Sequence, residues 1–366
     1  MDNDVVLWIV VATALAFDFT NGFHDTANAV ATSISTRAMA PRVAVTLAAI
    51  LNFVGAFLSL AVAATIAKGI VQADMVTLSI VFAGLIGAIS WNLLTWYFGL
   101  PSSSSHALIG GVVGAAFAAD GPSAIIVDGL IEKVAIPAVM APILAFVVAG
   151  VGILVTYRIV GRQRPSTVSR GYRLGQIISG SLFSLSHGTN DAQKTMGIIF
   201  LALVANGNLS ADADIPNWVV VSAATAIALG TYVGGWRIIK TMGSRIIKMD
   251  PAQGFSAQGS GAAVILAASH AGFPLSTTHV VSGGIMGAGA AKRVSAVRWG
   301  VAGNIVIAWV LTLPASALVG ALTYLVVHLF GDGAAGPVVV SGVLLIALGV
   351  AMARRVFQGQ TLTADG

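Results

Sequence analysis

The chain has 366 residues, of which 57% are hydrophobic and only 9% are charged. Soluble domains carry roughly 25% charged residues, so this composition excludes an ordinary soluble domain and indicates a helical protein with several membrane spans. The net charge of +5 could suggest a nucleic-acid partner. The basic residues gather in a few loops, however, so we expect a lipid bilayer as partner and no nucleic acid.

The first half of the sequence predicts five apolar segments, at residues 5–36, 43–67, 75–98, 106–119 and 134–157. The first is too long for one simple span. Because Asp18, Gly22 and Asp25 interrupt it, we predict a broken helix there. A proline and four serines, at 101–105, come directly before the fourth segment.

The second half begins after a basic stretch, 158–173, and predicts apolar segments at 174–204, 218–235, 260–271, 276–291, 299–330 and 338–353. The first of these carries His187 and Asp191, and we predict a second broken helix. If the segments cross in turn, the basic loops 37–42, 158–173, 237–248, 292–298 and 354–355 share one side. The positive-inside rule predicts that this side is cytoplasmic and that the N-terminus is outside.

Two motifs occur twice. Gly22 to Asn28 recurs as Gly188 to Lys194, with Asp25 matched by Asp191, and Pro101 to His106 resembles Pro274 to His279. We therefore predict two halves of one plan, 1–157 and 174–366, joined by a basic cytoplasmic linker at 158–173. In the predicted topology the matching segments run in opposite directions. Inverted repeats with broken helices near the midplane are typical of secondary transporters.

The second motif pair carries hydroxyl groups at the start of two glycine-rich helices. Unpaired N–H groups and the positive end of the dipole favour an oxyanion at such a place, and hydroxyls add neutral donors. A single copy would be read as an ordinary N-cap. Two copies, each with proline before and histidine after, favour oxyanion binding. The residues are Ser103, Ser104, Ser105, Ser276, Thr277 and Thr278.

Asp25 and Asp191 cannot bind a bare anion, because like charges repel strongly in a low dielectric. They fit a co-transported cation, or protons whose binding removes the repulsion. A structural pair between Asp191 and Lys194, three residues apart on one helical face, stays open. His187 could shuttle protons. Asn28 and Gln193 could coordinate the cation or donate to the substrate. A zinc site is not expected, since no close pair of ligands has the usual spacing.

In this order the motifs resemble the inorganic phosphate transporter (PiT) family. The resemblance rests on His24 to Asn28, His187 to Gly197 and Pro274 to His279, with support from 241–243, 250–255 and 309–314. It implies a phosphate symporter in which Asp25 and Asp191 belong to the site and the segments 102–105 and 276–278 bind phosphate. The fold that it implies is all-α and polytopic, with two inverted repeats, broken helices and Ser/Thr-rich hairpins at a central site.

Two positions depart from the sodium-using animal members, which have an acidic residue in place of Asn52 and an asparagine in place of Lys194. Both departures resemble the bacterial low-affinity branch, which takes up phosphate with protons, often as a neutral metal–phosphate complex. We therefore predict a proton-coupled phosphate importer of the cell membrane that works by alternating access. It is not an enzyme and has no resident cofactor. Sodium coupling, a sulfate permease of the same family and a homo-oligomer stay open.

The predicted roles divide into two sets. For phosphate binding we select Ser103, Ser104, Ser105, Ser276, Thr277, Thr278, Asn28 and Asn190. For the coupling proton or cation we select Asp25, Asp191, His187, Gln193 and Lys194. Asp25 and Asp191 would also hold Mg²⁺ or another divalent ion travelling with phosphate. An anion channel would not need two buried aspartates, and a hydrolase would not be expected to carry its catalytic triad twice.

Overall fold

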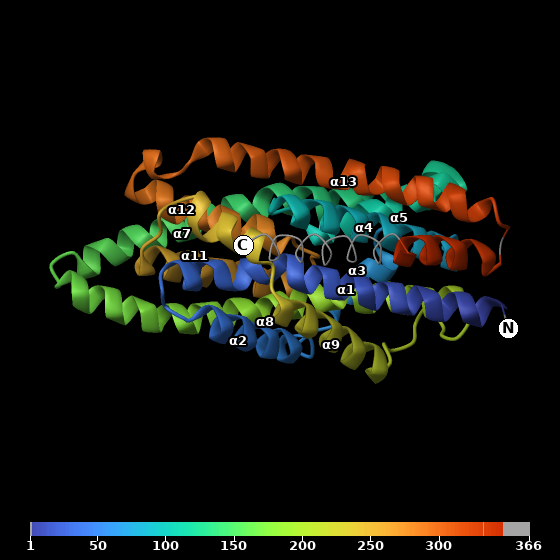
Figure 1. The fold of residues 1–366 in the computed structure, drawn as a ribbon, viewed down its shortest axis with the longest axis horizontal. Coiled ribbons are helices and arrows are strands. Elements are labelled where there is room, and N and C mark those ends of the chain that lie inside the picture. The colour runs from blue at the N-terminus through green and yellow to red at the C-terminus, as the bar shows by residue number, and fades with distance from the viewer. Residues whose placement is uncertain (1, 332, 347–366) are drawn as a thin grey trace, which may run out of the picture.

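The computed structural model describes residues 2–331 and 333–346 and is a bundle of helices, with no β-strand in these ranges (Figure 1). Five helical segments are long and apolar enough to cross a membrane, and α9 with the bent segment after it gives a sixth. This confirms the predicted all-α, multi-pass fold. The helices are α1 (Asp2–Ser35), α2 (Pro41–Gly55), α3 (Ala61–Lys68), α4 (Leu78–Phe98), α5 (Ser104–Asp120), α6 (Val127–Leu130), α7 (Ile136–Val160), α8 (Pro165–Ala205), α9 (Asn217–Val233), α10 (Trp236–Lys240), α11 (Pro251–His270), α12 (Thr277–Lys292) and α13 (Trp299–His328).

The helices that carry Asp25 and Asp191, α1 and α8, are each continuous. The prediction that these two segments are broken helices is therefore wrong. The glycines of these motifs allow neighbouring helices to pack closely and do not interrupt their own helix. A Cβ on Gly22 would lie 2.4 Å from the Ile227 carbonyl oxygen of α9, and one on Gly188 would lie 2.1 Å from the Asn52 carbonyl oxygen of α2. Small residues let helix backbones approach this closely.

The breaks fall one element later in each half. The predicted segment 43–67 is split into α2 and α3 by the turn at 56–60. The predicted segment 218–235 ends as α9, and the chain bends by 60° before Trp236–Arg245. Gly234 makes this bend with a φ of +76°, which glycine adopts without a steric penalty.

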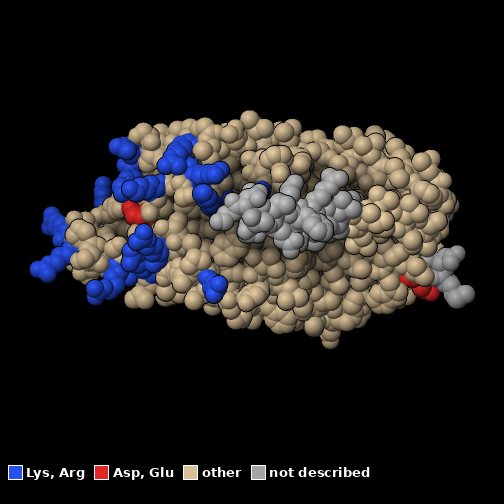
Figure 2. Space-filling model, viewed as in Figure 1, with Lys and Arg blue, Asp and Glu red and all other residues tan. Residues whose placement is uncertain are grey.

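Most of the basic stretch 158–173 is helical, because α7 ends at Val160 and α8 begins at Pro165. Proline suits this first helical position, since its fixed φ matches the helix. Figure 2 shows Lys and Arg side chains gathered at the end of the molecule where α7 and α8 join, opposite the N-terminus. Of the predicted segment 338–353, a helix covers 335–346; the rest, with Arg354 and Arg355, lies outside the described residues.

Two helical hairpins point their tips at the centre of the bundle. α4 and α5 form one and α11 and α12 form the other, and each hairpin turn holds a copy of the Ser/Thr motif. The tips touch, because Ser105 Oγ donates to the Leu275 carbonyl oxygen at 3.0 Å. Around them α9 packs on α1, α2 on α8, α13 on α5 and α12 on α7. Elements of one half therefore cover those of the other; the inverted relation between the halves stays a prediction.

Candidate functional site

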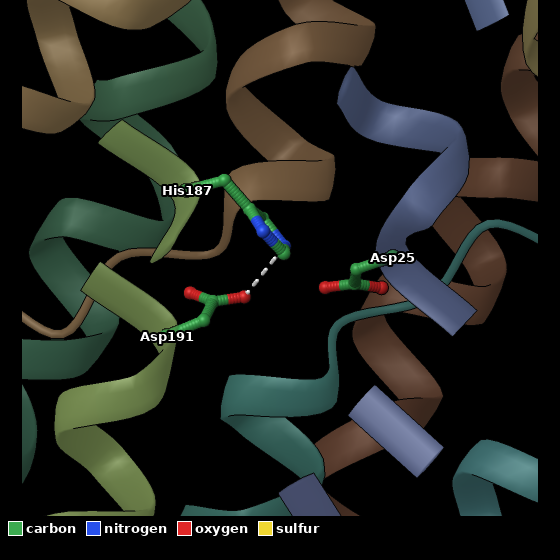
Figure 3. A group of neighbouring side chains, drawn as sticks. All are labelled: Asp25, His187 and Asp191. Atoms are coloured by element: carbon green, nitrogen blue, oxygen red, sulfur yellow. Dashed lines mark ion pairs between the residues drawn. The ribbon is translucent and has the colours of Figure 1, made fainter. Parts of the chain in front are cut away.

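The polar centre is a buried group of Asp25 from α1 with His187 and Asp191 from α8. One ligand atom of each lies within 4.8 Å of the others, and the three side chains are at most 2% exposed. Figure 3 shows the two carboxylates facing each other across a gap, with the His187 ring directed into it. Two ionised carboxylates this close repel each other, so a positive charge beside them stabilises the pair.

His187 is held by a chain of polar side chains. Its Nδ1 lies 3.1 Å from Asn52 Oδ1 on α2, and Asn52 Nδ2 donates to Thr231 Oγ1 of α9 at 2.8 Å. The other ring nitrogen, Nε2, lies 3.1 Å from Asp191 Oδ2. The two helices that pack around the centre thus orient the imidazole towards the carboxylate.

Lys194 lies on the same face of α8, at 1% exposure. Its ammonium pairs with Asp191, donates to Ser105 Oγ, and donates to the Leu275 carbonyl oxygen at 2.9 Å. The structural pair with Asp191 that the sequence left open is therefore present. An ammonium has three N–H donors, and these three oxygens satisfy all of them. Lys194 ties α8 to both hairpin tips.

Asn28 occupies the matching position on α1, three residues after Asp25. Its Nδ2 donates to Thr277 Oγ1 at 3.2 Å and to Thr278 Oγ1 at 2.8 Å. Thr277 Oγ1 lies 3.4 Å from Asp25 Oδ2 and 3.4 Å from Asp191 Oδ2. The first turn of α12 thus lies between the two carboxylates, and a neutral amide stands where the other half has an ammonium.

The hydroxyl residues at the two helix starts divide into two roles. Ser103 and Ser276 are N-caps, whose oxygens accept from the backbone N–H groups of His106 at 3.1 Å and His279 at 3.3 Å. Ser104, buried at 1% exposure, has no hydrogen-bond partner for its hydroxyl in the part of the chain that the structure describes. Both helix starts lie beside the acidic centre and direct the positive ends of their dipoles there.

Two of the predicted site residues are engaged elsewhere. Gln193 Oε1 accepts from Val62 N at 2.8 Å and Ala63 N at 3.2 Å, so it caps α3, whose own cap residue supplies no side-chain bond. Asn190 Nδ2 donates to Ser269 Oγ at 2.9 Å and to the Phe273 carbonyl oxygen at 3.1 Å. Asn190 therefore holds the tip of the α11–α12 hairpin beside the centre.

His24 and Ser102 belong to the sequence motifs, but the sequence predicts neither Thr95 nor the contacts by which these residues hold the other hairpin. His24 Nδ1 lies 2.6 Å from Asp25 Oδ1, and its Nε2 lies 3.0 Å from Thr95 Oγ1. Ser102 Oγ donates to the same Thr95 hydroxyl at 2.8 Å. A threonine near the end of an apolar helix carries no recognisable signal in one sequence. The position of His24 next to Asp25 was the only available pointer.

Comparison with known proteins gives one consistent answer. Residues 21–320 match the family described as the phosphate transporter family. A relative from Mycobacterium tuberculosis (strain ATCC 25618 / H37Rv) is 58% identical over 327 residues, which cover 89% of this chain and 78% of the relative. A relative from Bacillus subtilis (strain 168) is 49% identical over 335 residues, covering 90% of this chain and 99% of the relative. Each bears the name "Probable low-affinity inorganic phosphate transporter".

A solved structure, named "The sodium-dependent phosphate transporter", is also similar to this chain. It has a TM-score of 0.78 and 26% sequence identity, and the alignment covers 89% of this chain and 99% of that one.

Proposed function

Because the chain belongs to the phosphate transporter family and is a multi-pass membrane protein, we propose that it imports inorganic phosphate together with protons by alternating access. We further propose that it works in the cell membrane. The gathering of basic side chains at the α7–α8 end supports a cytoplasmic position for that end and an outside position for the N-terminus.

Phosphate would bind between the starts of α5 and α12. The Ser104 hydroxyl, which has no partner among the described residues, would supply a neutral donor there. The hydroxyls of Ser105, Thr277 and Thr278 would donate to phosphate by leaving their present acceptors, and the helix dipoles favour an anion. Asp25 and Asp191 would repel phosphate unless a positive charge accompanies it. This requirement links the substrate to its companion cation, because phosphate is bound favourably only when a positive charge accompanies it.

The observation that carries the choice of protons over sodium is the position of Lys194. Its ammonium is surrounded by a carboxylate, a hydroxyl and a backbone carbonyl, the oxygen types that bind sodium in transporters. With both aspartates ionised, −2 from the carboxylates and +1 from Lys194 leave a charge of −1. The fixed ammonium of Lys194 thus neutralises one of the two carboxylate charges, as a bound cation would, and a bound proton can neutralise the other.

Phosphate could also be transported as a complex with a divalent metal ion instead of alone. Asp25, Asp191 and His187 offer two oxygens and one nitrogen within 4.8 Å. Carboxylates suit Mg²⁺ and Mn²⁺, whereas an imidazole ligand favours the transition metals. Metal and phosphate together would carry little net charge, which lowers the penalty for moving them through the protein interior.

Uptake of labelled phosphate into proteoliposomes tests the proposal, with pH and sodium gradients imposed separately and sulfate as competitor. We expect accumulation driven by an inward proton gradient, and loss of accumulation in Asp25→Asn. Ser104→Ala should raise KM, whereas Ser123→Ala, on the exposed turn after α5, should not. Accumulation driven by sodium alone would refute proton coupling, and preference for sulfate would refute the substrate.

A further inference from the structure

A third buried carboxyl, besides Asp25 and Asp191, lies deep in the bundle and has no role in the site described above. Asp18 is on α1, seven residues before Asp25 and therefore about 10 Å from it along nearly the same face of the helix. Its side chain is 0% exposed. Neither carboxylate oxygen has a hydrogen-bond partner of normal geometry among the residues that the structure describes.

The surroundings of Asp18 are polar but neutral. Asn21 on α1 and Thr195 on α8 interact with its carboxyl group, and both are at most 1% exposed. Asn21 Oδ1 and Thr195 Oγ1 also lack hydrogen-bond partners within the described ranges. The unpartnered Asn21 Oδ1 can only accept, and a protonated carboxyl could donate to it, whereas the Thr195 hydroxyl can donate to the ionised acid or accept from the neutral one.

No cation is available to pair with an ionised Asp18. The two charged groups that act on its carboxyl in the described part of the chain are Asp191 and Lys194 of α8. These two are paired with each other, so their effects on Asp18 oppose and largely cancel. The other long helices against this part of α1, α4 and α9, carry no Asp, Glu, Lys, Arg or His.

We propose that Asp18 binds the transported proton. The inference rests on the proposed function and deepens it. An unpaired carboxylate buried at membrane depth is very unfavourable, so a group in this position takes up a proton instead. Buried as it is here, Asp18 would be the neutral acid. When the transporter opens, water reaches the carboxyl and the proton leaves for the solvent.

The position of Asp18 agrees with this role. It lies on α1 between the N-terminal end of that helix and Asp25, and Figures 1 and 2 show this end of α1 opposite the basic side chains. With the proposed orientation, a proton arriving from outside reaches Asp18 before the phosphate site. Asp25 and Asp191 remain the carboxylates beside phosphate, and Asp18 is a further proton-binding group on the same helix as Asp25.

The test uses the isosteric variant Asp18→Asn, which imitates the protonated acid permanently. A symporter completes net uptake only if the proton leaves on the inside before the empty carrier returns. Exchange of inside phosphate for outside phosphate does not require the proton to be released. In proteoliposomes the variant should therefore retain phosphate–phosphate exchange within about twofold of wild type, while accumulation driven by a proton gradient is lost. Asp212→Asn, at a fully solvent-exposed carboxylate, is the surface control and should behave as wild type in both assays.

Three results would overturn the assignment. They are proton-driven accumulation by Asp18→Asn, equal loss of exchange and accumulation in a correctly folded variant, and an unchanged pH profile of uptake in Asp18→Glu. The last measurement applies even if Asp18→Asn does not fold, because a displaced carboxyl that carries the proton must shift that profile. Wild-type protein that accumulates phosphate on a sodium gradient alone would overturn the proposed coupling as well. Proton-driven wild type with an equally active Asp18→Asn would overturn only the role of Asp18.

Discussion

Replacing Lys194 with methionine removes the ammonium from the centre of the bundle and keeps most of the length of the side chain. Asp191 then remains buried without its cation, and Ser105 and the Leu275 carbonyl lose a donor. Removing one partner of a buried ion pair typically costs about 3–5 kcal/mol of folding free energy, because the other charge is left uncompensated. We expect Lys194→Met to destabilise the protein by this amount.

A double variant distinguishes the effect of losing the ion pair from the effect of losing side-chain packing. In Asp191→Asn/Lys194→Met neither charge remains, and replacing both members of a buried pair is often nearly neutral. The double variant should therefore recover at least about 2 kcal/mol relative to Lys194→Met. The coupling energy, which adds the cost of Asp191→Asn alone to this recovery, should then lie in or above the upper part of the range of about 0.5–3 kcal/mol measured for residues in direct contact.

An exposed pair in the same protein provides the matched control. Lys292 Nζ lies 3.2 Å from Asp250 Oδ2, and the Lys292 side chain is 55% exposed. Surface pairs contribute only about 0–1 kcal/mol, so Lys292→Met should change the free energy of unfolding by no more than that. Reversible unfolding in mixed micelles, titrated with SDS, measures all the variants. The reasoning fails if Lys194→Met costs no more than Lys292→Met, or if the double variant is as unstable as the sum of its single variants.

Three further predictions concern the helices around the site. Gly188→Ala places a Cβ 2.1 Å from the Asn52 backbone and should destabilise by about 1–3 kcal/mol through overpacking. Gly171→Ala, with no atom near the new Cβ, should not, and the same SDS titration compares the two. Gln193→Ala removes the cap of α3 and should cost about 1 kcal/mol with little change in KM for phosphate uptake; a large rise in KM with unchanged stability would instead support a cation-ligand role. Lys194→Asn removes the ammonium from among the oxygens of Asp191, Ser105 and Leu275, so that Na⁺ can bind there. Phosphate binding measured by calorimetry should then depend on added Na⁺ in the variant and not in wild type. Equal sodium dependence in both proteins would contradict the role of the ammonium.

Some properties follow from the sequence because they depend on local composition and on recurrence. The membrane class follows from the scarcity of charge, and the two acidic centres stand out because Asp25 and Asp191 occupy repeated motifs in apolar surroundings. Two copies of the Ser/Thr motif predict two helix starts, since proline and hydroxyl residues are local signals for the start of a helix. The hairpins themselves were implied by the resemblance to the family. None of these inferences depends on which helices pack against one another.

Helix continuity illustrates where local reasoning fails. Gly22 and Gly188, together with buried acids, suggest interruptions when each segment is considered alone. In the structure each glycine lies against the backbone of another helix and allows the two helices to pack closely. The role of each glycine therefore depends on a packing partner far away in the sequence.

The amino-acid sequence alone establishes the family, the helical membrane class and the identity of the two central aspartates. The individual roles of the polar side chains become visible in the folded bundle. Lys194 reaches Ser105 and Leu275, Gln193 caps α3, and Asp18 faces Thr195 without a charge to pair with. The physical reason is that a buried polar group takes its role from the partners within hydrogen-bond reach, and those partners come from helices that the chain brings together only on folding.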